Sequence, residues 1–199
     1  KQLNKPDKYA LYMKKTIALL AIISILSFTA AKAIPAGCGG VCIGTTYLGS
    51  GVLNDDTVGK GMGFPKHPHD NMEIVSIPLF GDLHHKDSTG RDEIIRENDV
   101  QIMSAGSGIA HSEMNANKDK EVKFLQLWVF PKEKDIEPRY QQKTFLPEDR
   151  LNKILTVVAP DDERAVWINQ DAWFSLARLS KEVNIVYKLH KEGNGVYAF

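Results

Sequence analysis

The sequence predicts an all-β protein, a barrel or sandwich of antiparallel strands followed by a second unit of similar style. Three observations support this prediction. From residue 51 onward, short apolar segments are separated by turn residues about every ten positions. Several of these segments alternate apolar and polar residues, as a strand with one buried face does. No long stretch has helical spacing with capping residues.

The first 33 residues differ in pattern and are predicted to be a leader outside the fold. From Met13, two lysines precede the apolar run Thr16–Phe28, and Ala31-Lys32-Ala33 follows. A charged start, a short apolar middle and small residues at the end are typical of a secretory signal, so residues 13–33 predict export. A membrane span would need about 20 apolar residues, and a buried core helix is the alternative. Residues 34–50 are expected to be a linker.

Residues 51–130 are predicted to form the first unit. "MEIVSIPLF" (72–80) is rich in β-branched residues, and its Pro78 indicates an edge or a bulge. "DSTG" (87–90) fits a hairpin turn. "EVKFLQLWVFP" (121–131) is the longest strand candidate.

A break in the pattern follows the first unit. Residues 131–150 contain three prolines and many charges, which predicts a linker. "KILTVVAP", "AVWINQDAWFSLARL" and "VNIVYKL" then resume short strands, so residues 151–199 are predicted to form the second unit.

Charge and cysteine content exclude some functions. The formal charge is balanced overall, but the first 50 residues carry a net +5 and the remainder a net −5. A mildly acidic body argues against binding the phosphate backbone of nucleic acid. Both cysteines lie in the first 50 residues, so the body has no thiol for a disulfide, a thiolate metal site or a nucleophile.

Five of the six histidines lie in one 45-residue window. His67 and His69 are two residues apart in "HPH", and His111 and Glu113 have the same spacing in "HSE". Side chains two apart in a strand share a face, so two such strands facing each other would offer three imidazoles and a carboxylate. These donors suit iron, nickel, copper, manganese or zinc. Four ligands on an octahedral ion would leave two positions open, whereas a closed tetrahedral zinc site is the alternative.

Three further residues leave alternatives open. Glu73 has the same strand parity as His67 and His69, so it could supply the carboxylate in place of Glu113. His84 and His85 are adjacent and would face opposite ways in a strand. They precede a charged turn, and we interpret both as surface or hydrogen-bonded loop residues.

Several motifs resemble known proteins. Gly61, His67, His69, Glu73 and Gly81 have the spacing of the first cupin motif, and Gly106, His111 and Asn115 that of the second. "VLNDDTV", "HPHDNMEIVSIPL", "DVQIMSAGSGIAHSE" and "FLQLWVFP" together resemble the pirin family.

This resemblance implies a bicupin, two jelly-roll barrels with the metal in the first. Residues 51–130 would then be the N-terminal, metal-binding cupin and residues 151–199 a partial C-terminal cupin. Family members usually carry an aromatic, His-rich segment before "VLNDDTV" and further strands after the last residues here. The resemblance therefore implies a chain shortened at both ends, with an incomplete second barrel.

The resemblance also implies the ligands and the activity. Carried over by position, the metal ligands are His67, His69, His111 and Glu113, with Glu113 also the catalytic carboxylate. Glu73 is then expected either to lie next to the ligands and support them or to have a structural role. One divalent transition metal is expected, Fe(II) first, with Ni, Cu, Mn and Zn as alternatives.

The predicted function is a non-haem metal dioxygenase. Some bacterial pirins are described as quercetin 2,3-dioxygenases, so the expected partners are a flavonol-like aromatic substrate and O2. Direct binding of nucleic acid is not expected, nor is a stable membrane span in the mature form, and a monomer is predicted. The animal form is described as a nuclear, iron-dependent transcription cofactor, so an iron-dependent regulatory module is the alternative. An inactive, shortened copy is a further alternative. The family is mostly cytoplasmic, whereas residues 13–33 predict a periplasmic or secreted protein.

Overall fold

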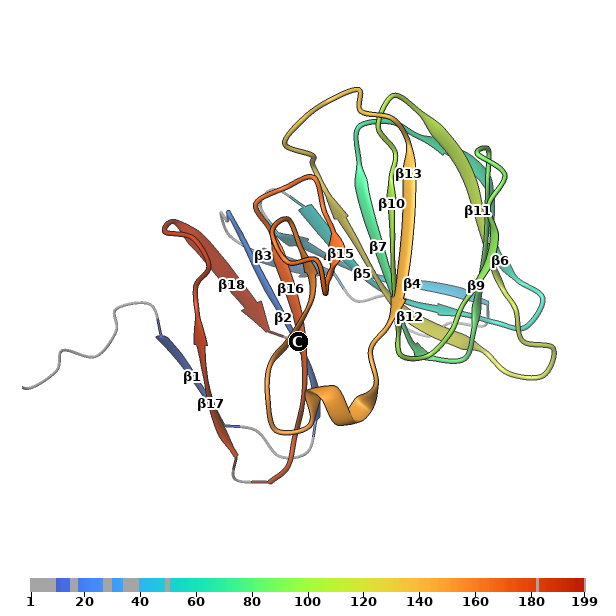
Figure 1. The fold of residues 1–199 in the computed structure, drawn as a ribbon. Coiled ribbons are helices and arrows are strands. Elements are labelled where there is room, and N and C mark those ends of the chain that lie inside the picture. The colour runs from blue at the N-terminus through green and yellow to red at the C-terminus, as the bar shows by residue number, and fades with distance from the viewer. Residues whose placement is uncertain are drawn as a thin grey trace, which may run out of the picture.

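The computed structural model describes residues 10–14, 18–26, 30–33, 40–48, 51–181 and 183–198. Strands make up most of these residues, and the one helical element among them is η1 (Pro147–Arg150), a single 3-10 turn. The predicted all-β class is therefore confirmed. Figure 1 shows two sets of strands side by side, with η1 on the connection between them.

The first set is a barrel of two antiparallel sheets. The larger sheet has the order β13-β10-β7-β12-β5-β4-β3. Its strands are β3 (Ala30–Ala33), β4 (Val41–Leu48), β5 (Gly51–Val58), β7 (Glu73–Phe80), β10 (Asp99–Ser104), β12 (Val122–Val129) and β13 (Arg139–Thr144). The smaller sheet has the order β6-β11-β8-β9. It consists of β6 (Gly63–His69), β8 (Leu83–Asp87), β9 (Asp92–Ile95) and β11 (Ile109–Asn115).

The second set holds a five-stranded sheet, β15-β14-β16-β2-β18, and the pair β1-β17. The larger sheet is built from β2 (Ala18–Leu26), β14 (Leu155–Ala159), β15 (Val166–Trp167), β16 (Trp173–Leu179) and β18 (Asn194–Ala198). The pair consists of β1 (Ala10–Lys14) and β17 (Asn184–Lys188).

Two of the apolar clusters show how the first barrel is held in shape. One lies between its sheets, where Leu83 and Ile95 of the smaller sheet meet Val122 and Phe124 of β12. The other joins the barrel to the second set and includes residues from β7, β10, β12, β14 and β16. Each fully buried large apolar side chain contributes about 1.5–3 kcal/mol to the stability of the fold. Packing therefore determines which face of β7 and of β12 points away from the barrel interior.

Three segments predicted to lie outside the strands contain strands. The proline- and charge-rich residues 131–150 hold β13, which pairs with β10 from Asp99↔Thr144 to Ser104↔Arg139. Residues 34–50 hold β4, which pairs with β5. Ala18–Leu26, inside the predicted export signal, form β2 between β16 and β18. The export signal and the domain limits stay predictions.

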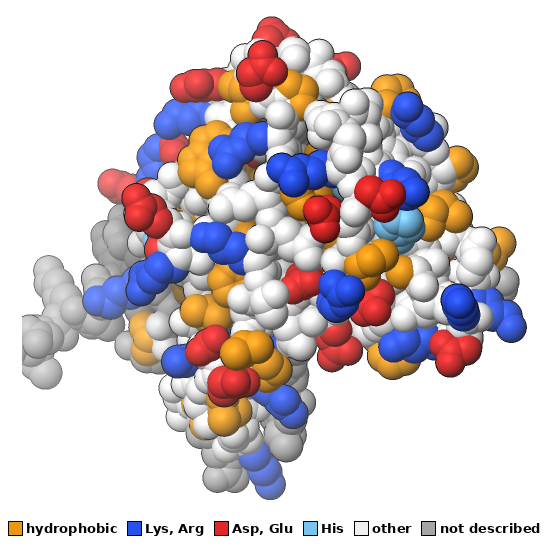
Figure 2. Space-filling model, turned by 45° about the vertical axis from the view of Figure 1, so that its right-hand side comes forward, with side chains coloured by type: hydrophobic (Ala, Val, Ile, Leu, Met, Phe, Trp, Pro, Cys, Tyr) orange, Lys and Arg blue, Asp and Glu red, His pale blue; other side chains and the backbone are white. Residues whose placement is uncertain are grey.

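The surface shows no dominance of either charge on the face in Figure 2, where acidic and basic side chains are interspersed. This mixture agrees with a formal net charge of zero. Among the described residues, no helix is both long and apolar enough to span a membrane.

Candidate metal centre

The two predicted motifs lie on neighbouring strands of the smaller sheet. β11 pairs with β6 so that His111 lies opposite His67 and Ile109 opposite His69. Burial alternates along β11, where every second residue from Ile109 is buried. His111 and Glu113 therefore share the inward face, as the two-residue spacing predicts.

A β-bulge separates the two halves of this pairing. Glu113 lies opposite Phe64, while His111 lies opposite His67, so two residues of β6 face one of β11. Pro65 falls in the bulge, where its missing N–H breaks no ladder bond. The bulge makes the backbone carbonyl of Pro65 available to the side chain of His67, whose Nδ1 lies 2.7 Å from that oxygen.

The three imidazoles meet inside the barrel. Possible ligand nitrogens of His67, His69 and His111 lie within 4.8 Å of one another. The ring centroids are 4.5 Å apart for His67 and His111 and 5.1 Å apart for His69 and His111. Three imidazoles so close together are a suitable donor set for a transition metal.

The tautomer of His67 follows from its hydrogen bond. A carbonyl oxygen can only accept, so His67 Nδ1 must donate to Pro65. In the neutral ring, Nε2 then carries the free lone pair. A backbone carbonyl that fixes a ligand histidine in this way is the usual support of a metal site.

His111 has no protein partner for either ring nitrogen. Its side chain is 1% exposed, and neither Nδ1 nor Nε2 has a hydrogen bond. Burial, reinforced by the neighbouring His67, His85 and His69, lowers the pKa of His111 to about 3. Burial also lowers the pKa of His69, whose Nε2 is likewise buried and without a partner. Neutral imidazoles with unpartnered nitrogens are in the form that binds a metal.

Glu113 is fully enclosed and held by two neighbours. Gln126 Nε2 donates to its Oε2 at 2.7 Å, and Ser76 Oγ donates to its Oε1 at 3.2 Å. Gln126 is fixed in turn, because its Oε1 accepts from Trp128 Nε1 at 2.8 Å. Burial raises the pKa of Glu113, and the bonds from Gln126 and Ser76 oppose this rise.

A histidine interpreted as a loop residue also belongs to this cluster. His85 on β8 lies opposite Glu113, is 0% exposed, and its possible ligand atom lies within 4.8 Å of those of His111 and Glu113. The surface interpretation of His85 is therefore wrong, because β8 forms an inner strand of the sheet beside β11. The two-residue spacing could not indicate His85, because the residue opposite it on β11, Glu113, lies 28 positions further along the chain.

Asp87 fixes the orientation of His85. Asp87 Oδ2 lies 2.9 Å from His85 Nε2, and Oδ1 accepts from the backbone and hydroxyl of Thr89. Burial raises the pKa of Asp87, but these hydrogen bonds outweigh it and the net shift is downward. An ionised Asp87 can only accept, so His85 Nε2 donates, and in the neutral ring the unpartnered Nδ1 would carry the lone pair.

The structure thus brings all four predicted ligands to one region in two overlapping triads. His67, His69 and His111 form one triad, and His85, His111 and Glu113 form the other. His111 is common to both.

Glu73 lies elsewhere. It accepts hydrogen bonds from Ser104 Oγ at 2.8 Å and from the backbone N–H of Asn169 at 3.2 Å. Ser76 on the same strand points at Glu113, so Glu73, three positions away, points to the opposite face of β7. Of the two roles expected for Glu73, support of the ligands is therefore wrong, and the structural one agrees with its contact with the second set. His84, in contrast, is partly exposed and pairs with Asp92 at 2.6 Å, as its surface interpretation predicts.

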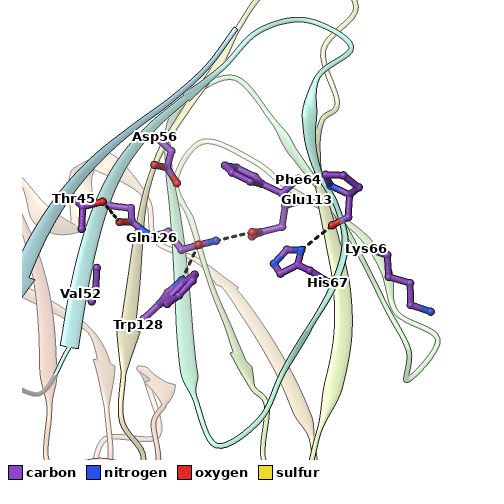
Figure 3. Close-up of a pocket in the computed structure, with 11 residues that line it drawn as sticks. Thr45, Val52, Asp56, Phe64, Lys66, His67, Glu113, Gln126 and Trp128 are labelled. Atoms are coloured by element: carbon purple, nitrogen blue, oxygen red, sulfur yellow. Dashed lines mark hydrogen bonds between the residues drawn. The ribbon is translucent and has the colours of Figure 1, made fainter. Parts of the chain in front are cut away.

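A cavity of about 700 Å³ opens beside the cluster. Figure 3 shows His67 and Glu113 on one side and Thr45, Val52 and Asp56 on the other, with Lys66 directed away. Its lining is completed by Asn54, Phe64, Pro65, Gln126 and Trp128. Volumes of about 300–1,000 Å³ are usual for small-molecule sites.

Not every apolar residue near the two motifs lines the cavity. Phe64 lines the cavity, whereas Met103 and Ile109 pack in a buried cluster with Ile74 and Met62 is 45% exposed.

The residues present fit a metal ion. Three imidazoles and an enclosed carboxylate offer donors that suit Fe, Ni, Cu, Mn or Zn, and buried nitrogens without partners would otherwise be costly. A small antiparallel β-barrel with such a cluster inside defines the class of metal-binding cupins.

Comparison with protein families gives the particular family. Residues 42–129 match the model of Pirin, and residues 156–199 match the quercetinase C-terminal cupin domain. The chain belongs to the pirin family, as its motifs indicate.

Individual relatives agree with this assignment. The chain is 37% identical over 142 residues to the quercetin 2,3-dioxygenase of Escherichia coli K12, covering 71% of this chain and 60% of that protein. It is 36% identical over 146 residues to a pirin-like protein of Caulobacter vibrioides, covering 72% of this chain and 62% of that protein. The chain thus spans about three fifths of the length of these two relatives.

Solved structures share the fold. The crystal structure of YhhW from Escherichia coli superimposes with a TM-score of 0.61 at 33% identity, over 71% of this chain and 64% of that one. A structure of the bacterial pirin YhhW in complex with nickel(II) gives a TM-score of 0.57 at 22% identity, over 95% of this chain and 97% of that one.

Proposed function

We propose that this protein is a metal-dependent dioxygenase that opens the ring of a flavonol-type substrate such as quercetin, with O2 as the oxidant. The observation that carries the proposal is that one cavity of about 700 Å³ is lined by both His67 and Glu113. A relative that is 37% identical to this chain over 142 residues is named a quercetin 2,3-dioxygenase.

The ligands of the proposed metal are His67, His69, His111 and Glu113. A divalent ion bound there would act as a Lewis acid and offer open positions to the adjacent oxygen atoms of the substrate. Fe(II) is the proposed ion, and nickel is the strongest alternative because YhhW has been crystallised with nickel(II). His85 Nδ1 lies beside His111 and Glu113 and would support the same ion or the carboxylate.

Glu113 is the proposed proton acceptor. Enclosure raises its pKa, which brings a carboxyl group closer to the range needed to take a proton from a phenolic hydroxyl. Gln126 and Ser76 keep its two oxygens in place, so the carboxylate does not rotate away from the cavity. The link from Gln126 to Trp128 ties this proton acceptor to an aromatic wall of the same cavity.

The aromatic walls suit a flat substrate. Phe64 and Trp128 both line the cavity, and aromatic side chains bind flat rings by stacking or edge contacts. The edge of Trp128 also meets His69, with ring centroids 5.2 Å apart, so the ring-binding wall adjoins the proposed metal ligands.

The test combines metal analysis with oxygen uptake. The purified protein, loaded with Fe(II) or Ni(II), should hold about one ion per chain by plasma mass spectrometry and consume O2 with quercetin. Glu113→Ala and His111→Ala should abolish the uptake. His190→Ala, at a histidine of the second set stacked on Trp173, is the control and should retain it. Oxygen uptake that survives both site variants would refute the mechanism, and a folded protein that takes up no metal would favour an inactive copy.

A further inference from the structure

The cavity wall formed by β5 carries a carboxyl group that the proposed reaction does not use. Alternate residues of this strand, Val52, Asn54 and Asp56, line the cavity, while the intervening Asp55 is exposed. Figure 3 shows Asp56 on the opposite side of the cavity from His67. The polar part of this wall therefore faces the proposed metal ligands across the space a substrate would fill.

Asp56 is buried without a complete set of partners. Its side chain is 1% exposed, and its Oδ1 has no hydrogen bond. Asn54 differs, because its Oδ1 already accepts from Thr45 Oγ1 at 2.9 Å. A buried oxygen without a partner is unfavourable by about 1–3 kcal/mol, so Asp56 would gain from a ligand group that reaches it.

The surroundings of Asp56 allow it to act as a donor as well as an acceptor toward a ligand hydroxyl. Burial, together with the negative charge of Glu113 and of Asp55, raises the pKa of Asp56 to about 7. The carboxyl group is thus protonated in part of the molecules near neutral pH and can then donate as well as accept. Val52, Phe64 and Trp128 make much of the remaining wall apolar, which suits an aromatic ligand bearing isolated polar groups.

We propose that Asp56 determines the specificity of this cavity by hydrogen bonding a hydroxyl group on the ring of the substrate that lies farthest from the proposed metal ligands. This inference rests on the proposed function, because it takes the ligand to be a flavonol held at its other end by the metal. A site that pairs a substrate hydroxyl discriminates strongly against the analogue without it, since the buried partner is then left unpaired.

The experiment measures binding rather than turnover. Ni(II)-loaded protein is titrated without O2 with quercetin and with 3-hydroxyflavone, which keeps the adjacent oxygens but lacks the other hydroxyls, and binding is followed by tryptophan fluorescence. The wild type should bind quercetin at least about tenfold more tightly than 3-hydroxyflavone, the equivalent of one hydrogen bond to a buried group. Asp56→Leu should lose this preference with 3-hydroxyflavone affinity and nickel content unchanged, and Asp56→Asn should retain part of it.

The control is Asp55→Asn, the same change at the neighbouring residue on the outer face of β5, which should leave both affinities unchanged. If wild type binds both flavonols and Asp56→Leu keeps the preference for quercetin, the role of Asp56 is refuted while the proposed function stands. If nickel-loaded wild type binds neither flavonol, the proposed function fails and the role of Asp56 fails with it.

Discussion

Two regions of the molecule bury different kinds of side chain. The interior of the first barrel encloses His85, His111, Glu113 and Gln126 beside a cavity. The core that joins the barrel to the second set is apolar instead, with Val157, Val158, Phe174 and Leu176 among its members. Polar residues inside a barrel reduce its stability unless they have hydrogen-bond or metal partners. The interior of the first barrel is therefore the region expected to bind a ligand.

One histidine from each set of strands shows which property marks the candidate site. Burial lowers the pKa of both His111 and His190. His190, however, stacks flat on Trp173, with ring centroids 4.8 Å apart and an interplanar angle of 3°. His111 is surrounded by three other imidazoles. A lowered pKa therefore does not by itself distinguish the two histidines, and the convergence of several donors identifies the candidate site.

Removing two histidines of the triad should have the largest effect. We expect His67→Ala/His111→Ala to reduce the metal content from about one ion per chain to near zero, because loss of a single outer partner already costs about 10–100-fold in affinity. Plasma mass spectrometry after dialysis measures this content. His190→Ala should keep its metal, and equal loss in this control would remove the contrast between the two regions.

Truncating the apolar core should affect folding instead of metal binding. Phe174 is 2% exposed and packs in the cluster shared by the two sets. We expect Phe174→Ala to lower the free energy of unfolding by about 3–5 kcal/mol. Urea denaturation measures the loss, and the folded fraction should bind metal as the wild type does. A variant with normal stability and impaired metal binding would contradict this division.

The pH dependence of stability should report the carboxyl group in the cavity wall. The pKa of Asp56 is about 7 in the fold against 3.8 in the unfolded chain. Asp56 therefore keeps its proton to a higher pH in the folded protein than in the unfolded chain. Its contribution to stability falls as pH rises from about 4 to 7. The lowered pKa of His111 acts in the opposite direction, losing stability as pH falls below 6.5, but it is common to both proteins compared.

We expect the free energy of unfolding of Asp56→Asn, measured relative to that of the wild type, to rise by on the order of 2 kcal/mol from pH 5 to pH 7. The reason is that one pKa unit corresponds to about 1.4 kcal/mol. The measurement is urea denaturation of metal-free protein, in the presence of a chelator, at both pH values. Asp55→Asn is the matched control. A stability difference that does not change with pH would show that Asp56 is ionised throughout this range.

The sequence predicted those features that depend on local spacing. The all-β class followed from short alternating segments, and the inward face of His111 and Glu113 followed from their two-residue separation. Charge and proline content predicted a linker over residues 131–150, but residues 139–144 form β13. A strand at the edge of a sheet tolerates polar side chains that reach solvent, and β13 is such a strand.

Features that depend on pairing between distant strands could not be predicted from spacing. His85 lies in the cluster because the register of β8 against β11 places it opposite Glu113. Glu73 lies outside the cluster because Ser76 is on the inward face of β7 and Glu73 is on the other. Asp56 enters the cavity through β5, which lies in the other sheet. Each of these outcomes depends on a register that a single sequence does not encode locally.

The adjacent histidines 84 and 85 give the finest test, because they differ in little except the face they occupy. His85 is enclosed beside His111 and Glu113, whereas His84 is partly exposed and pairs with the exposed Asp92. We expect His85→Ala to weaken metal affinity about tenfold, as loss of a supporting partner does. His84→Ala should leave metal affinity unchanged and have little effect on stability, because its contact with Asp92 is exposed to solvent. Competition with a chromogenic chelator measures both affinities. Equal affinities in the two variants would mean that the proposed ion is held by the first triad alone, and that His85 only supports Asp87.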